Sequence, residues 1–185
     1  EEIGMALKNK SIYAILGILN LSPCSGYDIK KYSDKVLSGF WNENFGHIYP
    51  TLKMMLEDGL IEIVSREENQ NKIKYGITEK GKQELEAWLL EETVPQPIRS
   101  EFLLKLLFSS SQPRDKVIHM LESYKKLHEK DLDKYLEMQK NLEQDNRDIS
   151  KERVCFMKAV LRRGVISSEA VIHWCDETIE ELQRS

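Results

Sequence analysis

Cysteine is scarce in this sequence. Its 185 residues include three cysteines, Cys24, Cys155 and Cys175, which lie far apart and form no Cys-x-x-Cys pair. An odd and widely spaced set predicts neither a disulfide framework nor a structural zinc site, and it favours a reducing environment. The first residues also show no secretory signal pattern. We therefore expect a cytoplasmic protein.

Long hydrophobic runs are missing as well. The longest nearly apolar stretch, "SIYAILGILNL" at residues 11–21, is interrupted by polar residues and is too short to span a bilayer. We expect no membrane partner. With 41% hydrophobic residues, a chain of this length buries roughly 70% of its unfolded surface. It is therefore expected to fold without disulfide bonds or structural metals, as one or two domains.

Motifs for catalysis are absent too. The sequence holds no phosphate-binding glycine loop, nucleophile elbow or dinucleotide fingerprint, so we expect no enzyme and no cofactor. The histidines show no metal spacing with one another. Ligand types come together only at Glu169, His173 and Cys175, but Cys175 points well round the helix from His173. This favours a surface ion pair and a buried thiol, and we expect no metal.

An excess of positive charge is lacking. The formal net charge is -4, and between Lys8 and Lys82 eleven basic residues face nine acidic ones, a balance of +2. Each phosphate that a protein neutralises adds a salt-sensitive increment of affinity, so one such module would bind nucleic acid weakly. Useful affinity would need two modules on one duplex.

The first half of the sequence carries the pattern of three helices. A first helix is marked by apolar residues from Ile12 to Leu21, and a second runs from about Tyr27 to Leu37 with Ser25 as a plausible N-cap. The third lies in "GHIYPTLKMMLEDGLI" at residues 46–61, where Gly59 supplies a positive φ to end it. One apolar stripe lines this third helix: Ile48, Leu52, Met55, Leu56 and Leu60.

A hairpin and a fourth helix follow. Apolar residues alternate on both sides of a polar run between residues 61 and 77, which predicts a two-stranded hairpin with an exposed tip. Thr78 then caps a fourth helix, "EKGKQELEAWLLEE". Three helices, a hairpin and a closing helix predict a winged helix-turn-helix with a two-stranded wing over residues 1–92.

The second half is expected to be an all-helical dimerisation domain. Two prolines in a linker at residues 93–100 separate it from the first half. Residues 101–185 then show a short apolar helix, a long helix from Pro113 to Gln144, and a last segment that Gly164 and Ser167 split into two helices. The long helix has a heptad seam: Val117, Leu121, Tyr124, His128, Asp131, Tyr135, Met138 and Leu142. The fold class is therefore mainly α.

Several strings resemble successive landmarks of one protein family. "AILGILNLSPCSGYDIKKY", "FWNENFGHIYPTLKMMLEDGLI", "KYGITEKGKQELEAWL", "SEFLLKLLF" and "LRRGVISSEAVIHWCDETIEEL" occur in that order. The chain is similar to PadR-family transcriptional regulators of the longer subtype, whose helical C-terminal domain is shared with virulence-gene activators. This resemblance implies a homodimer that represses, or less often activates, promoters by binding a palindrome in double-stranded DNA. It also implies release by small phenolic or drug-like molecules.

A recognition helix enters the major groove by its first turns, so exposed residues there are candidates for contacts with base edges. In the third helix these are His47, Tyr49, Pro50, Thr51 and Lys53. For Tyr49 and Pro50 the alternative is that they pack the turn. At the start of the second helix Ser25, Tyr27 and Lys30 are candidates for holding a phosphate, although a plain N-cap role explains Ser25 equally well.

The hairpin tip offers further candidates for contacts with the DNA backbone or minor groove. These are Asn69, Gln70, Asn71, Lys72 and Lys74. The neighbouring Glu67 and Glu68 weaken the local field, so a solvated loop is the alternative.

A small effector would need a pocket where the two halves meet, because regulation requires different affinity for two arrangements of the DNA-binding modules. The candidates are Trp41, Trp88 and Trp174, with Phe40, Phe102 and Phe108 near the same junction. Ordinary core packing is the alternative for each of them. For the whole chain, the alternative is a winged-helix module that binds a protein and not DNA, which the acidic net charge permits.

Overall fold

The computed structural model describes residues 10–37, 40–41, 44–67, 72–93, 99–144 and 150–184. The chain divides into two compact units, residues 1–95 and residues 96–185. The two units are described separately, as unit 1 and unit 2. Within the described residues no helix is long and apolar enough to cross a membrane.

In its described residues, unit 1 has the α-helices α2 (Ser11–Leu19), α3 (Gly26–Tyr32), α4 (Phe45–Glu57) and α5 (Glu79–Leu89). The helix α3 runs on into a π-helical turn, η1 (Ser33–Leu37). The apolar positions predicted from spacing form one core, except for Leu21, which is exposed because α2 ends two residues earlier. The buried core residues are Ile15, Leu16, Ile18, Leu19, Ile29, Ile48, Leu52, Met55, Leu60, Ile61, Tyr75 and Leu85.

The sheet of unit 1 has three strands, so the prediction of a two-stranded wing was incomplete. The hairpin strands β2 (Ile61–Glu67) and β3 (Lys72–Ile77) pair antiparallel, and β1 (Cys24–Ser25) pairs with the other edge of β3. A two-residue strand carries no period-two pattern, so only the backbone pairing of Cys24 with Tyr75 reveals it. This strand ties the start of α3 to the wing.

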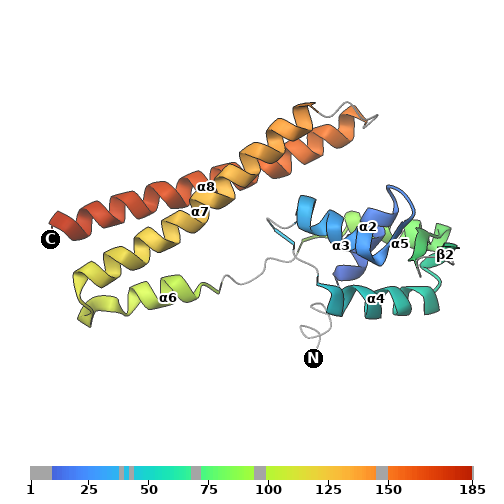
Figure 1. The fold of residues 1–185 in the computed structure, drawn as a ribbon, viewed down its shortest axis with the longest axis horizontal. Coiled ribbons are helices and arrows are strands. Elements are labelled where there is room, and N and C mark those ends of the chain that lie inside the picture. The colour runs from blue at the N-terminus through green and yellow to red at the C-terminus, as the bar shows by residue number, and fades with distance from the viewer. Residues whose placement is uncertain are drawn as a thin grey trace. The chain divides into compact units, whose positions relative to one another are not determined.

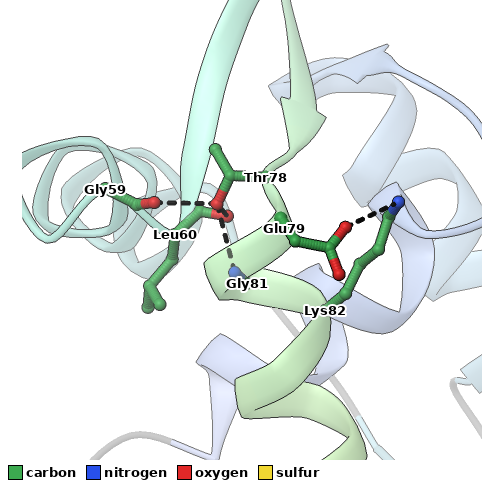
Figure 2. Close-up of polar contacts among 6 residues, drawn as sticks. All are labelled: Gly59, Leu60, Thr78, Glu79, Gly81 and Lys82. Carbon is green, nitrogen blue, oxygen red and sulfur yellow. Dashed lines mark hydrogen bonds and ion pairs between the residues drawn. The ribbon is translucent and has the colours of Figure 1, made fainter.

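A compact junction joins the end of α4 to the start of α5 (Figure 2). Gly59 has a φ of 68° and ends the α4 turn as predicted. The Thr78 hydroxyl lies 2.8 Å from the Gly59 carbonyl and 3.0 Å from the Leu60 carbonyl, and it accepts a hydrogen bond of 3.1 Å from the Gly81 amide. Thr78 is therefore the N-cap of α5, as predicted, and it also closes the turn that precedes β2.

Unit 2 is entirely helical in its described residues. It comprises α6 (Glu101–Leu107), a 3-10 turn η2 (Ser109–Ser111), α7 (Arg114–Gln144) and α8 (Lys151–Arg184). Figure 1 shows α7 and α8 as two long antiparallel helices that pack along each other. The core between these two helices and α6 is aromatic-rich: the ring centroids of Phe102 on α6 and Tyr124 on α7 lie 3.7 Å apart in a stack, and Trp174 on α8 meets Phe102 edge-on at 6.2 Å.

The predicted break in the last segment is wrong, because α8 continues without interruption from Lys151 to Arg184. Gly164 is buried, and a Cβ atom there would lie 2.6 Å from the ring of Tyr135 on α7. The glycine therefore allows close approach of two helices and does not terminate one. Along α7, Asp131 is exposed, while the other seam residues are buried or half-buried.

Candidate nucleic-acid interface

The helix α4 has one buried and one exposed face. Asn44 is its N-cap, and its side-chain oxygen accepts a hydrogen bond of 3.1 Å from the His47 amide. Ile48, Leu52 and Met55 are fully buried, whereas the exposed face carries His47, Tyr49 and Lys53. The Lys53 side chain is 80% exposed, and its ammonium group lies 4.0 Å from the Glu57 carboxylate. Packing of the apolar face in the core fixes the orientation of the polar face.

Thr51 does not belong to the exposed face, which corrects its prediction as a DNA contact. Only 6% of Thr51 is exposed. It stands three residues after Ile48 and four before Met55, a spacing that places it on the buried stripe. Helix α4 packs against α2, α3 and β2, so its buried face is wide enough to include a threonine. The spacing of Thr51 from Ile48 and Met55 could have predicted its burial, but its polar side chain suggested an exposed position.

Tyr49 is half-exposed and also packs. A Cβ atom added at Gly26 on α3 would lie 2.8 Å from the Tyr49 ring, so α3 and α4 meet at this glycine. Burial raises the pKa of the neighbouring Tyr75 phenol, and Tyr49 raises that pKa further. Tyr49 therefore packs at the contact between α3 and α4, and half of the residue remains exposed.

Pro50 lies within α4 and not at its start. The Asn44 cap sets the first turn of this helix. Because proline has no N–H, Pro50 cannot donate to the carbonyl of Gly46, four residues earlier.

The three residues predicted to contact DNA at the start of α3 differ in their surroundings. Ser25 is buried and forms a capping box with Asp28: its hydroxyl donates to a carboxylate oxygen of Asp28 at 2.6 Å and accepts from the Asp28 amide at 3.2 Å. This geometry favours the N-cap alternative for Ser25. Tyr27 is exposed. Lys30 is half-buried and forms an ion pair with Asp34.

The wing holds the last two predicted contacts. Lys74 is half-buried in β3, opposite Ser25 on β1 and Ser65 on β2. Lys72 begins β3, but its side chain lies outside the described part of the structure, as do residues 68–71 with Asn69, Gln70 and Asn71. The register of β2 shifts between Ile63 and Ser65, which leaves Val64 as a bulged residue.

The three tryptophans predicted to line an effector pocket lie in different surroundings. In unit 1, Trp41 is half-buried, and Trp88 stacks on Tyr13 with ring centroids 4.4 Å apart and an interplanar angle of 3°. In unit 2, Trp174 belongs to the α7–α8 core. For Trp88 and Trp174 these contacts are those of ordinary core residues.

The described residues contain no group of three or more His, Cys, Asp or Glu side chains that could hold a metal ion. Cys175 is fully buried, while His173 is exposed and lies 3.4 Å from Glu177. Burial is the main cause that raises the pKa of the Cys175 thiol, which disfavours the thiolate that a metal would need. Glu169 is exposed.

These positions assemble a surface at the first turns of α4 and the start of α3 that suits a polyanion with exposed base edges. Tyr27, Tyr49, His47 and Lys53 are exposed residues, and their hydroxyl, imidazole and ammonium groups can donate hydrogen bonds. Sequence reasoning missed two residues of this region, Asn44 and Phe45. Asn44 was recognisable, because asparagine is a preferred N-cap.

Comparison with known proteins gives two family matches that together cover most of the chain. Residues 15–87 match the model of the transcriptional regulator PadR-like family, and residues 98–183 match the model of the virulence activator alpha C-terminal domain. The negative transcriptional regulator PadR of Bacillus subtilis (strain 168) is 38% identical over 105 residues. That alignment covers 55% of this chain and 58% of PadR.

Solved structures show the same architecture. Bacillus subtilis PadR in complex with operator DNA has a TM-score of 0.79 and 27% identity, covering 94% of this chain and 99% of that one. PadR has also been solved in complex with p-coumaric acid (TM-score 0.75, 27% identity, 92% and 97% coverage). The virulence activator AphA of Vibrio cholerae has a TM-score of 0.74 and 26% identity, with 94% and 98% coverage.

The fold of unit 1, the helical fold of unit 2 and the order of the two matched domains all agree with these relatives. The chain therefore belongs to the PadR-like family of transcriptional regulators, in the form that carries the virulence-activator C-terminal domain.

Proposed function

We propose that this protein is a homodimeric repressor that binds a palindromic DNA operator and is released from it by a small aromatic effector. The observation that carries the proposal is the exposed side of α4. This side carries His47, Tyr49 and Lys53, whereas the opposite side of the helix is a fully buried apolar stripe. A helix held in this way presents its first turns to the major groove. The complex of Bacillus subtilis PadR with operator DNA supports the proposal that this chain binds DNA.

Unit 2 provides the surface through which two copies of the chain would associate. Helix α6 has no buried residue. Leu107 at its end and Phe108 directly after it are 73% and 71% exposed, and Leu103 and Leu104 are exposed as well. Phe156 and Val160, one turn apart on α8, are exposed as well. Soluble proteins cover apolar surface of this kind with a partner. A two-fold related copy covers it and also brings a second α4 to the other half of a palindrome.

Selection of duplexes from a random pool, followed by affinity measurements at several salt concentrations, tests DNA binding. We expect one palindromic sequence to be enriched and its affinity to fall at least a hundredfold between 50 and 200 mM salt, about the loss that several phosphate contacts give. A winged-helix module that binds only proteins would enrich no duplex, and that result would end the proposal.

Two variants of α4 sharpen the same experiment. Lys53→Ala should weaken operator binding by about tenfold or more, the cost of one lost base contact, and leave thermal stability unchanged because its side chain is exposed. Thr51→Val is the matched control, since the Thr51 side chain is buried and cannot reach a base. Equal affinity of Lys53→Ala and the parent protein would remove Lys53 from the interface.

The effector is proposed to be a small aromatic acid, by analogy with the p-coumaric acid complex of PadR. We expect p-coumaric acid to change tryptophan fluorescence and to release the operator over the same concentration range. Single Trp41→Phe, Trp88→Phe and Trp174→Phe variants identify which indole reports binding. Planar cationic drugs provide a second ligand class. If no compound of either class changes both signals, the effector is dropped and DNA binding stands on its own.

A further inference from the structure

Phe45 is an apolar ring on the surface that is otherwise polar. It is the first residue of α4, and 44% of it is exposed. The apolar residues that follow it on the core side, Ile48 and Leu52, are at most 1% exposed. Phe45 therefore contributes little to the core of unit 1, and an exposed phenyl ring at this position calls for another explanation.

Neighbouring side chains hold the ring in place. Tyr49, one turn further along α4, stacks on it with centroids 6.2 Å apart and an interplanar angle of 16°. The ammonium group of Lys30 on α3 lies 6.0 Å from the centre of the ring, and Lys30 is itself paired with Asp34. The Asn44 cap fixes the backbone of the same turn. The ring is thus positioned before any partner binds, which lowers the entropy cost of using it.

We infer that Phe45 reads the 5-methyl group of a thymine in the major groove. The inference rests on the proposed function, because it takes α4 to be the recognition helix. A phenyl ring can neither donate nor accept a conventional hydrogen bond, so it adds nothing to phosphate binding. Apolar contact with the thymine methyl is the one feature of the major-groove edge that such a ring recognises. Phe45 therefore supplies the apolar part of the readout, on the side of α4 that also carries Tyr49.

Deoxyuridine substitution tests this assignment at the level of one methyl group. With the operator obtained by selection, each thymine is replaced in turn, symmetrically in both half-sites, and the affinity of the full chain is measured. At one position we expect a loss of about fourfold per methyl group, the factor that burial of one such group gives. Phe45→Ala should bind the unmodified operator more weakly and should lose no further affinity on that substitution.

Val64→Ala is the matched control. Val64 is also apolar, 53% exposed and in unit 1, but it lies on the wing. This variant should keep the full sensitivity to deoxyuridine, because the methyl group lies in the major groove. Phe45→Asn is a second variant that removes the apolar contact while adding a polar group, and it should be as insensitive as Phe45→Ala. Thermal unfolding of each variant confirms that unit 1 is intact.

The possible failures are distinct. If an operator is bound but no thymine methyl affects its affinity, or if Phe45→Ala retains the full loss, the Phe45 assignment is wrong and the proposed function survives. A ring that packs only on sugars would give that outcome. If selection enriches no duplex, the proposed function and the Phe45 assignment both fail.

Discussion

Gly81→Ala is expected to destabilise unit 1 by about 3 kcal/mol, even though alanine is the better helix former by about 1 kcal/mol. A Cβ atom at Gly81 would lie 2.1 Å from the carbonyl oxygen of Leu60 and 2.9 Å from a side-chain carbon of Ile77. The carbonyl is part of the backbone and accepts a hydrogen bond of 3.1 Å from the Thr78 amide, so it cannot move freely. The clash therefore outweighs the gain in helix propensity.

Urea unfolding followed by Trp88 fluorescence, in a Trp41→Phe and Trp174→Phe background, measures this change in unit 1. Gly17→Ala is the matched control, because Gly17 is also helical but a Cβ atom there would meet nothing within 4 Å. That variant should gain up to about 1 kcal/mol of stability. If the two substitutions shifted stability in the same direction, the tight packing of α5 on the turn before β2 would be refuted.

A fragment that ends at Glu92 is expected to be a monomer and to bind the operator at least about a hundredfold more weakly than the full chain. It keeps the exposed face of α4 but loses α6, α7 and α8, and with them the apolar surface proposed to join two copies. Binding through one module loses the effective concentration that a second module provides. Its salt dependence should also be about half as steep, since half of the phosphates are contacted.

Sedimentation and operator titration check this expectation, with circular dichroism to show that the fragment is folded. Leu107→Glu in the full chain is a second test. That side chain is 73% exposed in one protomer, so a charge there leaves the protomer folded but disrupts a dimer that covers it. A tight dimer of the fragment, or a dimer of Leu107→Glu with parental operator affinity, would contradict the division of roles between the two units.

Local signals in the sequence were sufficient for several features. Ser25 and Thr78 were recognisable as caps because a hydroxyl preceding a helical pattern satisfies free amides of the first turn. Gly59 was recognisable because a helix end commonly takes a positive φ. Apolar spacing located the core-facing residues of α2 and α4, since helical period and burial are directly linked.

Other features depended on contacts between distant segments. Whether Gly164 ends a helix or admits a neighbour depends on Tyr135, which lies on a different helix. The strand β1 exists because Cys24 finds a free edge of β3 some fifty residues later, and no local pattern records that edge. Thr51 is buried because three other elements close around α4.

The sequence by itself therefore determined the order of the helices and the hairpin in unit 1, the caps at Ser25 and Thr78, and the apolar residues that face the core, because these follow from interactions within a few turns of chain. The tertiary structure alone decided which polar residues stay in water. In the folded chain Thr51 and Ser25 are buried and do not belong to the candidate surface, whereas Phe45 is exposed on it. The physical reason is that burial is a property of the whole packing arrangement, whereas periodicity reports only one element at a time.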